Sequence, residues 1–334
     1  MTALAERAVS ALPAPRGPLS ACVLAALRDG GPPRDLPPVR DPYGEDEQLT
    51  LYCLYELHYR GFPGVDAERE WDLDLLRVRQ ALEREFLTAL RAEVPAGDDV
   101  EQEIAGLLTE PAEADGTGLS YHLLRTGEAW QLREYLVHRS LYHLKEADPQ
   151  AWVIPRLPAA AKAALVTVEH DEYGAGDPER VHARLFAAML RSTGLDDGYG
   201  AYLDHAPAST LAEVNLMSLC GLHRALRGAL VGQFATVELT SSPGSDRLVR
   251  AMDRMGFPAA ASAFYVEHVE ADAVHEQLMR RGVVQPLLAE EPELASDVVF
   301  GIRASTLLAE RFGDHLLSAW ADGRTSLRRA LPMG

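Results

Sequence analysis

The chain has 334 residues, of which 47 % are hydrophobic, and its formal net charge is −18. Such a composition is typical of a globular protein with a large core, and the negative charge disfavours nucleic acid and acidic membranes as partners. Three widely spaced cysteines without a CxxC pair predict neither a disulfide framework nor a thiolate metal site. No apolar run is long enough to span a bilayer, and residues 1–20 lack a signal-peptide pattern, so we expect a cytoplasmic protein.

The first third of the chain is predicted to lie outside the main core. Residues 1–44 contain a short apolar segment followed by a stretch rich in proline and glycine, which predicts a flexible or partly helical arm. Residues 45–115 are predicted to form a helical extension packed on the core, because helical spacing of apolar residues predicts amphipathic helices over 45–62 and 72–94. A polar, glycine-bearing stretch then separates this extension from a core predicted over 116–330.

The core is predicted to be all-α, because no run of alternating apolar and polar residues bounded by hairpin turns is visible. Long helices joined by short loops predict a bundle with its site between facing helices. Helices are predicted at about 120–147, 158–174, 178–193, 208–221, 222–240, 245–254, 257–281, 284–290 and 295–322.

One predicted helix carries the most informative residues, which are His268, Asp272 and His275. At 3.6 residues per turn, positions i, i+4 and i+7 fall within roughly 60° of one another, so two imidazoles and a carboxylate project from one stripe. This pattern is typical of metal ligands, although a polar helix face with chance histidines would look the same. The residues between them are mostly small or apolar, which favours a buried helix.

Facing helices offer further ligands for a carboxylate-bridged pair of metals. Glu146 ends the helix predicted at 120–147, and Glu238 lies among apolar residues that predict its burial. His143, three residues before Glu146, is explained more simply as a core histidine than as a hydrogen-bond donor to the site.

Glu172 and His182 form the remaining candidate pair. Their spacing of ten would place them on different faces of an uninterrupted helix, but Gly174, Gly176 and Pro178 should break the helix and let both turn toward one centre. Glu179 competes with Glu172, because Glu179 and His182 form the Glu-x-x-His pair of ferritin-like di-iron bundles. The residues alone leave the choice between Glu172 and Glu179 open.

These segments together resemble the haem-oxygenase-like di-iron oxidase family, also described as iron-containing redox enzymes. The resemblance rests on LYELHYRGF (54–62), LVHRSLYHLKEADPQAWVIPRL (136–157), DEYGAGDPERVHARLF (171–186), the region 215–242 and FYVEHVEADAVHEQLM (264–279). It implies a haem-oxygenase-like bundle of about seven core helices, to which this chain adds N-terminal helices. Mapped onto this sequence, the implied metal ligands and catalytic residues are Glu146, Glu172, His182, Glu238, His268, Asp272 and His275.

The resemblance also implies the chemistry. We expect two Fe(II) ions that activate O2 through a peroxo-di-iron intermediate and oxidise a small amine or amino-acid-like substrate, with N-oxygenation favoured over oxidative C–C bond cleavage. A haem is not expected, because clustered glutamates would repel its propionates, and without a GxGxxG fingerprint we expect no flavin or nicotinamide site. Electrons would then come from an external donor. A homodimer is a further expectation.

Two alternatives have different chemistry. In a metal-free helical binding or interaction protein, the same carboxylates and histidines would form a salt-bridged polar core. In a protein that binds zinc or manganese, the same ligands would serve no redox role, because first-row metals compete through availability as well as affinity.

Overall fold

The computed structural model describes residues 9–109 and 115–331, apart from the side chains of Glu270, Asp272 and Ala273. Over this part of the chain the fold is all-α, as predicted, and contains no β-strand. The α-helices are α1 (Pro18–Asp29), α2 (Glu45–Glu56), α3 (Leu73–Glu93), α4 (Val100–Leu107), α5 (Leu119–Arg125), α6 (Ala129–His143), α7 (Asp148–Ala151), α8 (Ala159–Glu172), α9 (His182–Ser192), α10 (Ala208–Leu222), α11 (Arg227–Arg254), α12 (Ala263–Gln277), α13 (Gln285–Glu290) and α14 (Ala295–Ala321).

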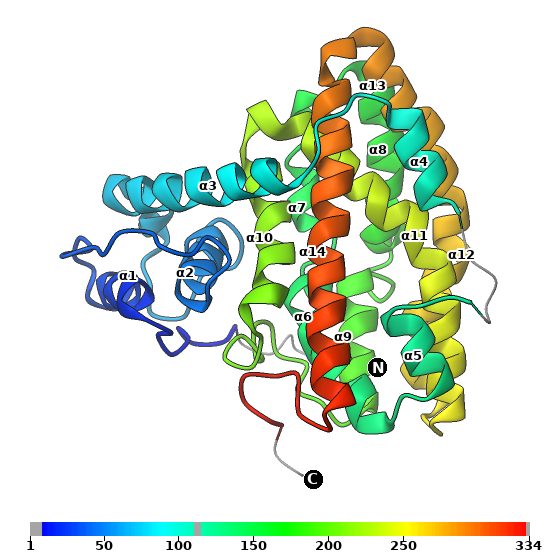
Figure 1. Cartoon of the computed structure of the whole chain (residues 1–334), viewed down its shortest axis with the longest axis horizontal. Coiled ribbons are helices and arrows are strands. Elements are labelled where there is room, and N and C mark those ends of the chain that lie inside the picture. The colour runs from blue at the N-terminus through cyan, green and yellow to red at the C-terminus, as the bar shows by residue number, and fades with distance from the viewer. Residues whose placement is uncertain (1–8, 110–114, 332–334) are drawn as a thin grey trace.

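Helix α11 is the central helix of the bundle. Every residue from Gly228 to Thr236 is buried, which requires neighbours on all sides. Helices α14 and α12 pack along α11, as Figure 1 shows, and α12 continues as a π-helix over Leu278–Val284 that packs on α8. The bundle therefore places α8, α11 and α12, which carry most of the predicted ligands, beside one another.

Glycines allow α11 and α14 to approach closely. A Cβ added at Gly232 would lie 2.1 Å from the carbonyl oxygen of Val298, and one added at Gly301 would lie 2.0 Å from that of Ala229. Both distances are far below van der Waals contact, so only glycine fits at either position. The spacing of three residues on each helix puts these contacts on one face.

Several helix ends differ from the sequence-based ranges. The helix predicted over 120–147 is divided into α5 and α6 by a turn containing Gly127, and the one predicted over 178–193 begins only at His182. The two helices predicted over 222–240 and 245–254 are one helix, α11, which contains Pro243. Proline weakens a helix locally, but here the packing of α12 and α14 against α11 supports the continuous helix.

Helices α1, α2 and α3 stand beside the bundle (Figure 1). Within the predicted arm, Pro18–Asp29 is helical. Helix α2 packs on α10, and a buried ion pair joins Glu56 of α2 to Lys145, with Nζ 3.0 Å from Oε2. The division of the chain into an arm, an extension and a core remains a prediction.

Within the described residues, no helix combines the length and the apolar character needed to cross a membrane.

Candidate metal centre

Glu146 lies in a turn just after the end of α6. The next residue, Ala147, has a left-handed backbone with φ of 70°, which ends the helix and begins the turn into α7. Lys145 is buried against Glu56, and its Nζ lies 4.7 and 4.4 Å from the ring centroids of Tyr52 and Tyr59. These contacts hold the turn against the N-terminal extension and thereby position the backbone of Glu146.

Glu172 and His182 meet because the chain between them is not helical. Glu172 is the last residue of α8 and His182 is the first residue of α9. Gly174, Ala175 and Gly176 all have positive φ, and a Cβ at Gly174 would lie 2.7 Å from the backbone nitrogen of Val181. This tight turn places Nδ1 of His182 2.7 Å from Oε2 of Glu172.

The competing residue Glu179 lies elsewhere. Its side chain is 61 % exposed and pairs with Arg184 at 2.9 Å, whereas Glu172 is buried. This geometry favours Glu172 over Glu179 as the carboxylate of the centre.

Helix α12 supplies His268 and His275 from one face. Nε2 of His268 lies 3.6 Å from Oε1 of Glu146, and Nδ1 of His275 lies 3.0 Å from Oε2 of Glu238 on α11. The side chain of Asp272, the third predicted ligand of this face, lies outside those that the structure describes. Six of the seven predicted ligands are thus brought together from separate elements.

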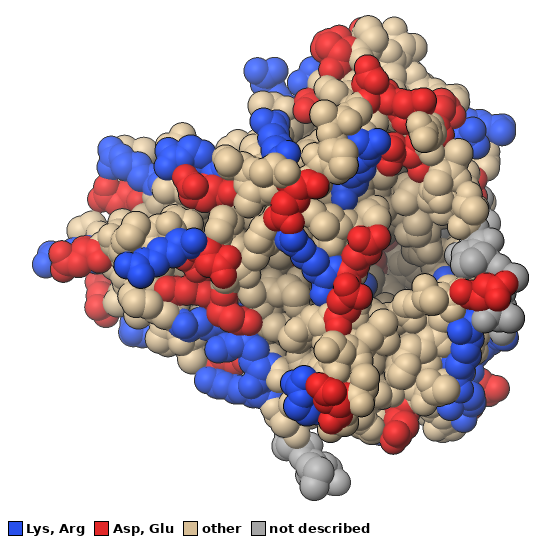
Figure 2. Space-filling model, in the orientation of Figure 1, with Lys and Arg blue, Asp and Glu red and all other residues tan. Residues whose placement is uncertain are grey.

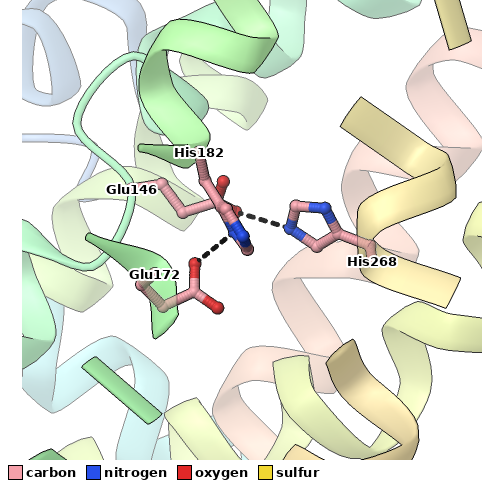
Figure 3. Close-up of side chains that lie close together, drawn as sticks. All are labelled: Glu146, Glu172, His182 and His268. Carbon is pink, nitrogen blue, oxygen red and sulfur yellow. Dashed lines mark ion pairs between the residues drawn. The ribbon is translucent and has the colours of Figure 1, made fainter. Parts of the chain in front are cut away.

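The six side chains form two groups that share one carboxylate. In each group, one ligand atom from every residue lies within 4.8 Å of all the others. The first group contains Glu146, Glu172, His182 and His268 (Figure 3), and the second contains Glu172, Glu238 and His275. Glu172 is therefore the one carboxylate that belongs to both groups of the described residues.

Several buried atoms of the cluster have no hydrogen-bond partner among the described residues. These are Oε2 of Glu146, Oε2 of Glu172 and Nδ1 of His182. The last two lie 2.7 Å apart without the geometry of a hydrogen bond. A metal ion held by Glu172 and His182 would accept the lone pairs of both atoms. The donor set of carboxylate oxygens and imidazole nitrogens fits iron.

The unused nitrogens of two histidines are occupied in the way metal-bound imidazoles require. Nδ1 of His268 donates to the carbonyl oxygen of Phe264 at 2.8 Å, which leaves Nε2 for the centre. His275 has the reverse arrangement, since Nε2 contacts Oδ2 of Asp171 at 3.3 Å and Nδ1 faces Glu172 and Glu238. Asp171 thus orients His275, a role that sequence reasoning missed.

His143 also contacts the centre, contrary to the simpler interpretation of it as a core histidine. Its Nδ1 lies 2.8 Å from Oε1 of Glu146. Burial would raise the pKa of Glu146, but His143 and His268 together hold that pKa well below its usual range. The pKa of His182 is raised, because the Glu172 carboxylate outweighs the effect of burial. The centre therefore stabilises the Glu146 carboxylate in the charged form that binds metal.

Glu169, one turn before Glu172, is a buried carboxyl group outside the predicted set. It is 2 % exposed, and neither oxygen has a hydrogen-bond partner among the described residues. Burial, and then the charges of Glu172 and Glu238, raise its pKa to about 9. Without metal, this carboxyl group keeps its proton in the folded protein at neutral pH.

Replacing Glu169 by glutamine is expected to stabilise the metal-free protein as pH rises. The unfolded carboxyl group ionises near about pH 4.3 whereas the folded one does not, so the folded state loses stability between that pH and about pH 9. The advantage of Glu169→Gln should be on the order of 4 kcal/mol near pH 7 and should vanish below about pH 4. Urea denaturation with chelator across this range would measure it, and a pH-independent difference would contradict the raised pKa.

A family model described as iron-containing redox enzyme matches residues 133–310, which is more than half of the chain. The chain belongs to this family. The match covers all seven predicted ligands, and the buried Glu/His cluster is compatible with the iron that the family description names. Family membership therefore supports an oxidoreductase that contains iron and has an all-α bundle. A search of curated proteins finds no significant match.

Proposed function

We propose that this protein is a non-haem di-iron oxygenase that uses O2 and an external electron donor to oxidise a small amine or amino-acid-like substrate. The observation that carries the proposal is the position of Glu172 between two ligand groups, one with Glu146, His182 and His268 and the other with Glu238 and His275. A salt-bridged core without metal would account for the contact of Glu172 with His182, but it would leave the buried Oε2 of Glu146 without a partner among the described residues.

Two bound iron ions would supply the reducing electrons that activate O2 at this centre. The protein's part is to hold the ligands and exclude water. Phe264 and Phe186 pack against the ring of His143, with centroids 5.0 and 4.8 Å away, and so place apolar surface around the imidazole that contacts Glu146. Such a surface limits the loss of a reactive oxidant to water.

N-oxygenation of a primary amine is the favoured reaction within this proposal. One oxygen atom of O2 would form the new N–O bond of a hydroxylamine, and the other would leave as water. The balance requires two electrons and two protons for each turnover, and the external donor would supply the electrons.

Iron loading followed by exposure to O2 tests the proposal. We expect the protein to bind about two Fe(II) ions per chain under anaerobic conditions. Rapid mixing with O2, with and without candidate amines and amino acids, should give a transient visible absorption band from the intermediate that the family resemblance implies. Mass spectrometry of the products should then show incorporation of one atom from ¹⁸O2.

The outcomes separate this proposal from its rivals. A preparation that binds zinc or manganese in preference to iron and consumes no O2 would indicate a site without redox function. A protein that binds no metal, and whose stability falls on His268→Ala because Glu146 loses an ion-pair partner, would indicate a polar core and would contradict the proposal.

A further inference from the structure

A large cavity adjoins the metal centre. Its volume is about 850 Å³, and Glu146 and His268 form part of its wall. The remaining wall comes from α6, α10, α11, α12 and α14, with residues of α4 and α5 at its edge. Figure 2 shows a hollow on the face that α4, α5 and α14 border. A small molecule could therefore reach the ligands Glu146 and His268 from this cavity.

The cavity wall contains an ion pair that the metal centre does not use. Nη1 of Arg139 on α6 donates to Oε2 of Glu213 on α10, at 3.2 Å. The guanidinium also stacks against Phe312, with Cζ 4.4 Å from the ring centroid. The bond to Glu213 uses one of its five N–H donors, and a carboxylate accepts up to about four hydrogen bonds, so both partners retain binding capacity.

Arg139 lies on the same stripe of α6 as the contact to the metal centre. Tyr135, Arg139, Tyr142 and His143 all line the cavity, and His143 contacts Glu146. Arg139 precedes His143 by four residues, which corresponds to about 6 Å along the helix. A molecule held by Arg139 would thus place a different part of itself, several bonds away, near Glu146.

Two further polar atoms in the wall lack partners among the described residues. The hydroxyl of Tyr265 and Nε2 of Gln233 make no hydrogen bond, although their side chains are 3 % and 0 % exposed. Both residues line the cavity. Buried donors are rarely left without acceptors, so these two atoms indicate that a ligand of this cavity carries polar atoms.

We propose that the Arg139–Glu213 pair binds the zwitterionic head group of an α-amino acid, whose carboxylate contacts Arg139 and whose ammonium contacts Glu213. This assignment rests on the proposed function, which it makes specific. The pair carries no net charge, so a substrate with only a carboxylate or only an ammonium would bring an uncompensated charge into a partly buried wall. A zwitterion places its carboxylate beside the positive Arg139 and its ammonium beside the negative Glu213.

The position of the pair also selects the part of the substrate that reacts. Because the head group would be held about one helical turn from His143, the group presented to the metal centre would belong to the amino-acid side chain. The hydroxyl of Tyr265 and the amide of Gln233 are available to polar atoms of that side chain. Oxidation of the α-amino group itself is not expected.

Calorimetric titration of the anaerobic Fe(II)-loaded protein tests the assignment without turnover. The panel contains the common L-α-amino acids and L-ornithine, and each one that binds is compared with the amine that lacks its carboxylate and the acid that lacks its α-amino group. For L-lysine these are cadaverine and 6-aminohexanoate. We expect at least one L-α-amino acid to bind about 100-fold more tightly than both of its analogues.

Variants of the pair make the test residue-specific. Arg139→Gln should weaken amino-acid binding about 100-fold while iron content stays at the wild-type level. Glu213→Gln should reduce the preference for the amino acid over the acid that lacks the α-amino group. The double variant R139Q/E213Q keeps the wall neutral and shows whether the fold tolerates loss of the pair. Arg303→Gln is the matched control, because Arg303 forms an ion pair with Glu103 that also joins two helices, outside this cavity.

If no amino acid binds more tightly than its analogues, or if folded R139Q/E213Q binds as well as wild type, the assignment is wrong. Failure of the proposed function would look different. Amino-acid binding that depends on Arg139, without any O2 consumption, would support the amino-acid subsite and contradict the proposed oxygenase function. O2 consumption with substrates whose binding does not change in Arg139→Gln would support the oxygenase function and contradict the subsite.

Discussion

Replacing Glu172 by alanine is expected to remove iron from both positions of the centre. Glu172 belongs to the group of Glu146, His182 and His268 and also to the group of Glu238 and His275. In the proposed di-iron centre its loss would leave each ion without the shared carboxylate, and we expect the affinity for iron to fall by more than about tenfold at both positions. Iron analysis after anaerobic loading and desalting would measure the loss directly.

Replacing a ligand that belongs to only one of the two groups should reduce iron content less than replacing Glu172. Glu146→Ala should deplete mainly the His182 and His268 position, and Glu238→Ala mainly the His275 position, so each should retain about one iron per chain. Glu179→Ala is the control, because Glu179 is exposed and paired with Arg184. Full iron content in Glu172→Ala, or loss of iron in Glu179→Ala, would show that the wrong glutamate has been assigned.

Replacing Gly232 by alanine is expected to destabilise the whole bundle by about 3 kcal/mol, because the new methyl group would overlap the backbone of α14. The added Cβ would lie 2.1 Å from the carbonyl oxygen of Val298, so α11 and α14 must move apart. Because Glu238 is six residues further along α11, this movement should also lower iron content. Urea denaturation gives the free energy of unfolding, and metal analysis gives the second readout.

Gly244→Ala provides the matched control in the same helix. A Cβ at Gly244 would have no neighbour within 4 Å, so the change should be neutral or should stabilise the helix by up to about 1 kcal/mol. Equal stability of the Gly232 and Gly244 variants would mean that the close approach of α11 and α14 does not limit the fold.

Local sequence patterns were enough to predict the fold class and most of the helices. Apolar residues recur at helical spacing over nearly the whole chain, which excludes a sheet without any tertiary information. Helix ends were less accurate. The interruption predicted between 240 and 245 is absent, because the packing of α12 and α14 supports a continuous α11 through Pro243, and His182 begins α9 four residues later than expected.

The candidate ligands were found from sequence because their residue types are unusual in apolar helices. A carboxylate such as Glu238 among Phe, Ala and Val needs a partner, and the stripe of His268 and His275 follows from helix geometry alone. Glu169 was missed because His170, Asp171 and Glu172 follow it, and in such a polar run nothing local distinguishes a buried carboxyl group from one exposed to solvent.

Residue types, helical periodicity and the glycine-rich break after Glu172 were therefore determined by the sequence itself. Only the tertiary structure decided which side chains meet. The sharing of Glu172 by two groups, the contact of Asp171 with His275 and the pairing of Arg139 with Glu213 all join residues from different helices. Such contacts depend on how helices cross, and crossing is fixed by close approaches such as Gly232 on Val298, which involve residues far apart along the chain.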